Sequence, residues 1–162
     1  MKYWYWFFQN LMWPLFWVLI RIFYKVEIHR EENLSGIYPP LIIASNHKTL
    51  FDGFLIGGVL PWGSRFFPLR FMTEEEHFRI PVLEFLRKIK LLKLFYLLTG
   101  GFPSYRGEGI EKAIQHPLKL LERKATVLMF PEGRLVREKG LGTFYDGAAT
   151  LAIKSGVPIL PF

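Results

Sequence analysis

The segment from Leu41 to Leu60 constrains the fold more than any other part of the sequence. Four apolar residues, Leu41–Ala44, are typical of a short strand buried on both faces of a sheet. The stretch Ser-Asn-His-Lys-Thr-Leu-Phe-Asp follows, and residues 53–60 are apolar enough to form a helix. A strand, a turn and a helix in this order favour an α/β fold with parallel strands.

His47 and Asp52 lie five residues apart in this stretch. In a continuous helix only residues three or four apart are neighbours. The two side chains can therefore meet only if His47 lies in the turn before the helix and Asp52 in its first turn. Such a pair is a base with its orienting carboxylate. From the spacing alone the plainer interpretation is favoured, in which His47 caps the helix and the helix dipole stabilises Asp52.

The rest of the chain alternates between strand and helix patterns. Thr73 with Glu76 forms a capping box, which predicts a helix start, and Pro117 is expected to kink or interrupt a later helix. Gly156 is a helix stop, and the strand after it is the last segment of the sequence, so the chain is expected to be a fragment or its sheet to have fewer strands than usual. The predicted strands are 23–29, 65–72, 126–130 and 157–162, and the predicted helices are 73–90, 108–124 and 147–154, with 91–98 a helix or a membrane-facing surface. The expected fold is a mixed, mostly parallel sheet flanked by helices.

The N-terminal segment holds eighteen residues without a charge, from Tyr3 to Ile20, and four of them are Trp. Eighteen residues are at the short limit for a spanning helix. Aromatic residues gather at membrane interfaces rather than at bilayer centres, and Gln9, Asn10 and Pro14 weaken a spanning assignment. We therefore expect an interfacial helix, with a single span or a buried core helix as the alternatives.

Composition supports an anionic partner. The chain has 162 residues, 51% of them hydrophobic, and a formal net charge of +7. A basic, aromatic-rich, apolar chain favours anionic membranes or phosphorylated ligands. Nucleic acid is disfavoured because the basic residues are scattered among apolar runs. The absence of Cys removes thiolate chemistry and Cys-based metal sites.

Two further segments carry residues suited to a phosphate. Gly100–Gly107 contains Arg106, whose planar guanidinium fits phosphate, although a plain Gly-rich turn is the simpler interpretation. Pro131–Arg134 follows a predicted strand, and the carboxyl end of a strand is the usual ligand position in an open α/β sheet.

Four blocks in order resemble the glycerophospholipid acyltransferase family: SNHKTLFD, GGFPSYRG, FPEGR with FYDGAATLAIKSG, and VPILPF. The resemblance covers about residues 41–162 and implies acyl transfer from acyl-CoA or acyl-carrier protein to a glycerolipid hydroxyl in phospholipid biosynthesis. It implies His47 as general base and Asp52 as its orienting residue, without a cofactor or metal. It also implies a glycerophosphate site, formed by Arg106, Glu132, Gly133 and Arg134.

The third block departs from the usual Phe-Pro-Glu-Gly-Thr-Arg-Ser pattern. Its Phe-Pro-Glu-Gly-Arg form is closer to the 2-acylglycerophosphoethanolamine acyltransferase branch, so the expected acceptor is lysophosphatidate or a lysophospholipid with a larger head group. We expect residues 1–25 to be a membrane-associated helix and 26–162 a catalytic domain, incomplete at its C-terminus, on the cytoplasmic face of the cell membrane. The alternative is an inactive membrane-bound lipid-binding protein on the same fold.

Overall fold

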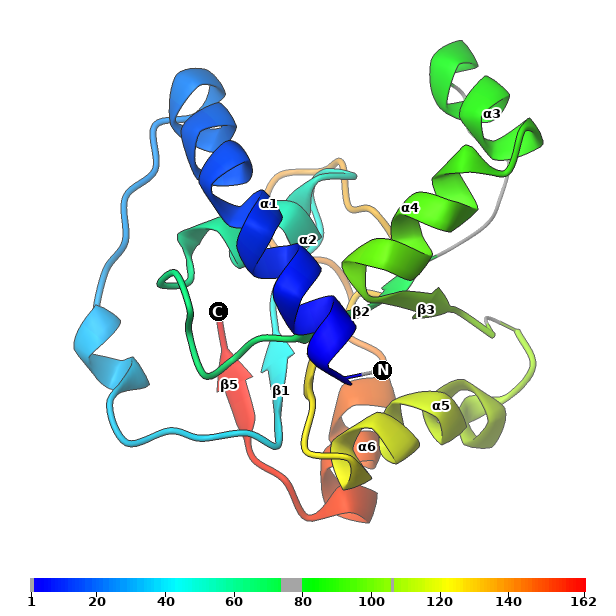
Figure 1. Ribbon diagram of the computed structural model, residues 1–162. Helices are drawn as coiled ribbons and strands as arrows, with labels where there is room; N and C mark the ends of the chain where they lie inside the picture. The colour runs from blue at the N-terminus through cyan, green and yellow to red at the C-terminus, as the bar shows by residue number, and fades with distance from the viewer. Residues whose placement is uncertain (1, 74–79, 106) are drawn as a thin grey trace.

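The computed structural model describes residues 2–73, 80–105 and 107–162, which form a five-stranded sheet flanked by helices (Figure 1). The strand order is β3-β2-β4-β1-β5, and all four pairings are parallel. The expected α/β class is confirmed, with a wholly parallel sheet in the described chain. The strands are β1 (Leu41–Ala44), β2 (Leu69–Thr73), β3 (Gly101–Pro103), β4 (Thr126–Met129) and β5 (Ile159–Pro161).

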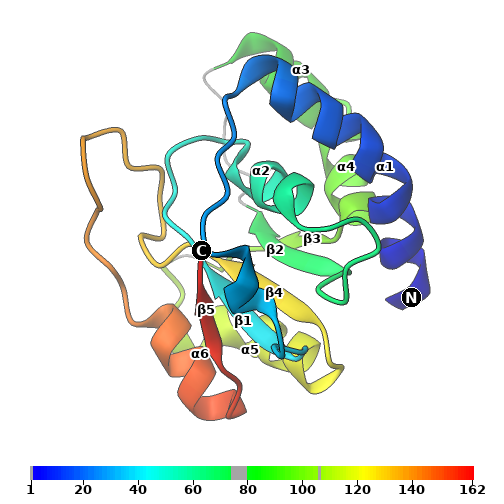
Figure 2. The ribbon, with the colours of Figure 1, turned by 90° about the vertical axis from the view of Figure 1, so that its left-hand side faces the viewer.

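Helices cover both faces of this sheet (Figure 2). Alternate residues of β1 point to opposite faces: Ile42 packs in the cluster with helices α5 and α6, whereas Leu41 and Ile43 pack in the cluster with α2. Full burial on both faces explains the continuous apolar run of this central strand. The helices are α1 (Lys2–Phe23), α2 (Asp52–Val59), α3 (Pro81–Lys88), α4 (Leu91–Thr99), α5 (Ile110–Glu122) and α6 (Gly147–Ser155), with a 3₁₀ turn, η1 (Glu31–Leu34).

Polar contacts fasten α1 to the α/β unit. The Gln9 amide nitrogen donates to the carbonyls of Leu69 (2.7 Å) and Thr99 (2.6 Å), and its oxygen accepts the Leu69 N–H at 2.8 Å. Among the described residues α1 is the one helix long and apolar enough to cross a membrane, over Trp4–Phe23. The side of α1 that faces the domain is nevertheless bound to it. The Gln9 side-chain amide both donates to and accepts from the backbone of Leu69, as the backbone of a neighbouring strand would.

A second group of contacts begins at the next residue of α1. Asn10 accepts the Gly63 N–H on its side-chain oxygen at 2.9 Å. Pro14 has no N–H for the Asn10 carbonyl four residues earlier, and the Trp62 indole N–H donates to that carbonyl at 3.2 Å. The proline is therefore accommodated inside a continuous helix. α1 approaches α2 closely at Gly58, where a Cβ would lie 2.3 Å from Ile20 Cδ1 and would force the Ile20 side chain to move.

Three predicted boundaries are wrong. Residues 23–29 form no strand: Phe23 ends α1, and the segment that follows has no regular secondary structure and is mostly exposed, including Ile28. The strand predicted from Arg65 begins only at Leu69. Pro117 is buried inside α5 without interrupting it.

The capping box predicted at Thr73 reaches into residues 74–79, which the structure does not describe. Thr73 is the last residue of β2, and its hydroxyl donates to the Phe102 carbonyl of β3 at 3.1 Å. The hydroxyl is therefore used by the sheet, and α3 begins at Pro81, in the N-terminal position that suits proline. The glutamates of the box lie outside the described residues.

Candidate active site

The candidate site lies at the carboxyl edge of the sheet, where β1 and β4 end side by side. The loop after β1 carries His47 and runs into α2. The loop after β4 carries residues 131–146 and runs into α6. Because parallel strands end at the same edge, two segments more than 80 residues apart in the sequence meet there.

The structure brings His47 and Asp52 together. His47 Nδ1 lies 3.0 Å from Asp52 Oδ2. Asp52 is the first residue of α2, and the same carboxylate accepts the N–H groups of Lys48 (2.6 Å) and Thr49 (2.9 Å) and the Thr49 hydroxyl (2.6 Å). The carboxylate thus closes the turn and holds the imidazole at once, which is how a separation of five residues becomes a contact.

These contacts fix the charge of Asp52. Burial alone raises the pKa of a carboxyl, but hydrogen bonds from Thr49, His47 and Lys48 outweigh burial and hold the Asp52 pKa below its usual range. An ionised carboxylate only accepts hydrogen bonds, so we assign the proton of a neutral His47 to Nδ1. The lone pair of Nε2 is then available to accept a proton. The ring also stacks on Phe130, with centroids 4.0 Å apart and planes 10° apart, which fixes its orientation.

Glu132 ties the two loops together. It is 1% exposed, and its carboxylate accepts the His47 N–H at 2.7 Å and the Gly142 N–H at 2.7 Å. Burial raises its pKa, but these two amides, with the nearby Lys48 ammonium and His47, more than offset burial and lower it. Each carboxylate oxygen accepts one backbone N–H, so Glu132 positions the His47 peptide.

Lys48 and the His47 carbonyl hold the second loop in place. The Lys48 ammonium donates to the carbonyls of Glu138, at 2.9 Å, and Gly140. The Val136 N–H donates to the His47 carbonyl at 2.8 Å. The Lys48 ammonium is therefore occupied by the loop.

The remaining predicted residues are not drawn into this network. Gly133 has φ +61°, a turn conformation that favours glycine, and a Cβ there would lie 3.3 Å from the Tyr145 ring. Arg134 is exposed on the same loop, and no hydrogen bond or ion pair joins it to a described residue. Arg106 lies outside the described residues. In the part of the chain that is described, no group of three or more His, Asp or Glu is placed to hold a metal.

An apolar cleft lies between α1, α2 and β2, with about 440 Å³ of space including its open part. Gly53, which follows Asp52 in the sequence, is one of its lining residues. Met12 and Phe16 from α1, Phe54 from α2 and Phe71 from β2 line it.

Sequence reasoning missed the roles of Thr49 and Phe130. A Thr three residues before an Asp is a common local hydrogen-bonding pair and was a usable signal. The stacking of Phe130 on His47 brings together residues that follow β4 and β1, so no local sequence pattern could have predicted it.

Fold and site together define the class of this protein: an open parallel α/β protein with a His–Asp pair at the carboxyl edge of its sheet. The sequence model of the family described as Acyltransferase matches residues 25–162. The chain therefore belongs to the acyltransferase family.

Curated relatives carry one enzyme name. The chain is 30% identical over 149 residues to the chloroplastic 1-acyl-sn-glycerol-3-phosphate acyltransferase BAT2 of Brassica napus, covering 90% of the chain and 39% of the relative. It is 26% identical over 137 residues to the 1-acyl-sn-glycerol-3-phosphate acyltransferase of Pseudomonas aeruginosa, covering 85% and 48%. The chain thus spans less than half the length of these relatives.

A solved structure shares the fold. PlsC, the 1-acyl-sn-glycerophosphate acyltransferase of Thermotoga maritima, matches with a TM-score of 0.63 at 22% identity, over 94% of this chain and 54% of that chain. This likeness extends the α/β assignment to the arrangement of the whole described sheet.

Proposed function

We propose that this chain transfers a fatty acyl group from acyl-CoA or acyl-carrier protein to the free hydroxyl of lysophosphatidate or a related lysophospholipid. The observation that carries the proposal is the 3.0 Å contact between His47 Nδ1 and Asp52 Oδ2 at the edge of the sheet. Membership of the acyltransferase family and the name shared by the curated relatives support acyl transfer to 1-acyl-sn-glycerol-3-phosphate. The Phe-Pro-Glu-Gly-Arg form of the third block keeps a larger head group as the alternative acceptor.

The proposed reaction is a direct transfer without an acyl-enzyme. His47 Nε2 removes the proton of the acceptor hydroxyl while its oxygen attacks the thioester carbonyl, and such general-base help contributes roughly 10²–10⁴-fold. Collapse of the tetrahedral intermediate breaks the carbon–sulfur bond, and the imidazolium returns its proton to the leaving thiolate. The Asp52 carboxylate stabilises the imidazolium between these two steps.

Each remaining feature has a role in this proposal. Glu132 positions the His47 backbone. Arg134 and Arg106 bind the acceptor phosphate, because a guanidinium forms paired hydrogen bonds with phosphate oxygens. The apolar cleft beside Gly53 receives part of the acyl chain. Neither a metal nor a resident cofactor enters the reaction.

The proposed division of the chain follows from the same features. Residues 1–25 form the membrane-associated helix and residues 26–162 the catalytic portion. A reaction between a lipid acceptor and a soluble cytosolic thioester places the protein at the cytoplasmic face of the cell membrane.

The test is thiol release by the purified chain and its His47→Ala variant, with both donors against lysophosphatidate and lysophosphatidylethanolamine. Turnover is expected with one acceptor class and is expected to fall by roughly 10²–10⁴-fold in the variant, while circular dichroism stays unchanged. Wild-type turnover in the variant would refute the base assignment. Lysolipid binding without turnover by the unaltered chain would instead support the inactive lipid-binding alternative.

A further inference from the structure

Two separate helical segments leave apolar side chains uncovered on one side of the molecule. On α1 one set of exposed apolar side chains recurs every three or four residues along a single face: Trp4, Phe7, Leu11, Leu15, Val18 and Ile22. Trp6, Trp17, Leu19 and Phe23 are exposed as well. The opposite face of the same helix carries Gln9 and Asn10, which are bound to the domain. The outer face of α1 thus forms a stripe along its whole length.

The second segment is the hairpin of α3 and α4. No residue of α3 is buried. Val82 and Phe85 are 66% and 61% exposed, and Ile89 continues the same helical face into the turn before α4. Leu91, Leu94 and Leu97, also exposed, follow on α4. An isolated eight-residue helix is marginal in water. We therefore expect α3 to be stable only when another surface buries its apolar face.

Charge on the hairpin indicates what covers this face. Residues 80–99 contain four basic residues, Arg87, Lys88, Lys90 and Lys93, and one acid, Glu84. Glu84 is paired with Arg87 at 2.6 Å, while Lys88, Lys90 and Lys93 are exposed. Exposed lysines beside an apolar helical face are the combination that binds the interface of an anionic bilayer.

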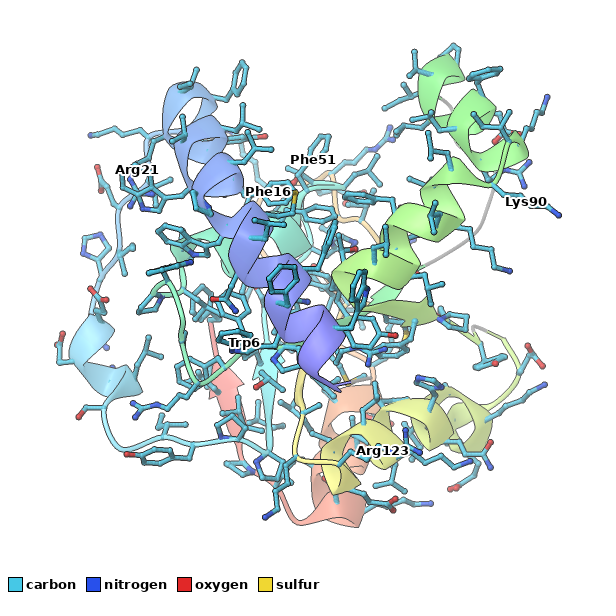
Figure 3. All side chains as sticks on the ribbon, in the orientation of Figure 1. Trp6, Phe16, Arg21, Phe51, Lys90 and Arg123 are labelled. Atoms are coloured by element: carbon cyan, nitrogen blue, oxygen red, sulfur yellow. The ribbon has the colours of Figure 1, made fainter. Side chains whose placement is uncertain are left out.

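The hairpin and α1 lie at the same end of the molecule as the candidate site. Both views show α3 and the C-terminal half of α1 rising beyond the same end of the sheet, the end to which the strand arrows point (Figures 1 and 2). Figure 3 shows Phe51, which directly precedes Asp52 and is exposed, between α1 and the hairpin at this end. The two helical segments and Phe51 therefore lie at the same end of the molecule (Figure 3).

We propose that the α3–α4 hairpin is a second membrane-docking element, which inserts Val82, Phe85 and Ile89 into the interface of an anionic bilayer beside α1. Binding through α1 alone leaves the molecule free to rotate about the axis of α1. Binding through the hairpin as well sets the tilt of the molecule relative to the membrane. The carboxyl edge of the sheet then faces the lipid. This docking does not depend on acyl transfer and is measured without substrate.

The absence of Cys from the chain provides a direct test. A single Phe85→Cys substitution is labelled with an environment-sensitive NBD fluorophore. The matched control is Ile153→Cys, on α6 across the sheet, where the native side chain is 82% exposed. Leu15→Cys on the outer stripe of α1 reports binding by that helix.

Each labelled chain is mixed with vesicles of phosphatidylcholine alone or with phosphatidylglycerol added. We expect the label at position 85 to shift to the blue on the anionic vesicles and to be quenched by acyl chains carrying doxyl groups, as at position 15, with no change at position 153. A label at position 85 that stays in water while position 15 inserts would overturn the proposal. A blue shift without vesicles, accompanied by a dimeric mass, would overturn it in favour of a second copy of this chain.

A second measurement separates insertion from mere proximity. The Val82→Ser/Phe85→Ser double variant is expected to lower the partition coefficient on anionic vesicles by roughly tenfold or more, because two apolar side chains are lost from the interface. Ile153→Ser, which removes an even more exposed apolar side chain from α6, is expected to leave it unchanged. Equal partitioning of both variants would contradict the proposal.

Discussion

Replacement of Asp52 by Asn separates the two roles of this carboxylate, closure of the turn and support of the imidazolium. An Asn with its oxygen in the place of Oδ2 still accepts the N–H groups of Lys48 and Thr49 and the Nδ1–H of His47. The Thr49 hydroxyl, which now donates to Oδ1 at 2.6 Å, can rotate and accept from the new amide. We therefore expect the fold and the His47 orientation to survive while the negative charge is lost.

The size of the effect follows from the burial of the pair. The side chains of His47 and Asp52 are only 20% and 12% exposed, so water screens their interaction weakly. A hydrogen bond to a charged group contributes about 1.5–3 kcal/mol and a neutral one about 0.5–1.5 kcal/mol. The difference of about 1–2 kcal/mol corresponds to a decrease in kcat of roughly 5- to 30-fold. That is less than the decrease expected on removing the base.

The assay is initial-rate thiol release by Asp52→Asn and by His47→Ala, with Asp52→Ala as the contrast. Ala leaves the N–H groups of Lys48 and Thr49 without their acceptor, so Asp52→Ala is expected to lose stability as well, by about 1–3 kcal/mol. The reasoning would be refuted if Asp52→Asn retained full kcat, or if it unfolded as readily as Asp52→Ala.

Three further predictions concern the same loops. Glu132→Gln places an amide NH₂ against the N–H of His47 or Gly142. We expect initial rates to show a lower kcat with little change in either KM, and urea unfolding to show a loss of stability of about 1–3 kcal/mol. A rise in the acceptor's KM alone would indicate a ligand role. The lowered pKa values of Asp52 and Glu132 contribute stability that is full above the pKa of the unfolded chain and is lost as the pH falls through about 4 and below; urea midpoints should fall in that window, and a flat profile would contradict the assigned hydrogen bonds. Arg134→Ala is expected to raise the acceptor's KM more than the donor's, and equal effects on both would argue against a phosphate role.

The turn between β1 and α2 could be predicted because local rules decide it. His47 and Asp52 fall within eight residues of each other and of the strand end, and cap and turn preferences limit the ways in which they can be arranged. The parallel sheet followed from the order of strand and helix patterns. Both inferences used contacts that are close in sequence or imposed by chain topology.

Long-range use of polar groups explains the failures. Thr73, expected at a helix start, is instead the last residue of β2, and its hydroxyl donates to the Phe102 carbonyl of the adjacent strand. The hydrogen bonds of Glu132 to backbone amides 85 and 10 residues away were likewise not predicted, while its expected ligand role stays a prediction. No residue pattern announces such a pairing, since a backbone amide is present at every position except proline.

The contacts of α1 bear on how an apolar N-terminal helix meets a bilayer. A helix that crosses the membrane turns every face to lipid or to other helices, and uncompensated polar side chains at bilayer depth are costly. Here Gln9 and Asn10 are bound to the backbone of Leu69, Thr99 and Gly63, so pulling α1 into a bilayer would break these hydrogen bonds and uncover α2. The same contacts keep the outer stripe parallel to the surface of the domain. They therefore favour a helix that lies in the interface over one that spans it, and they connect the depth of α1 in the lipid to the position of the sheet edge that carries His47.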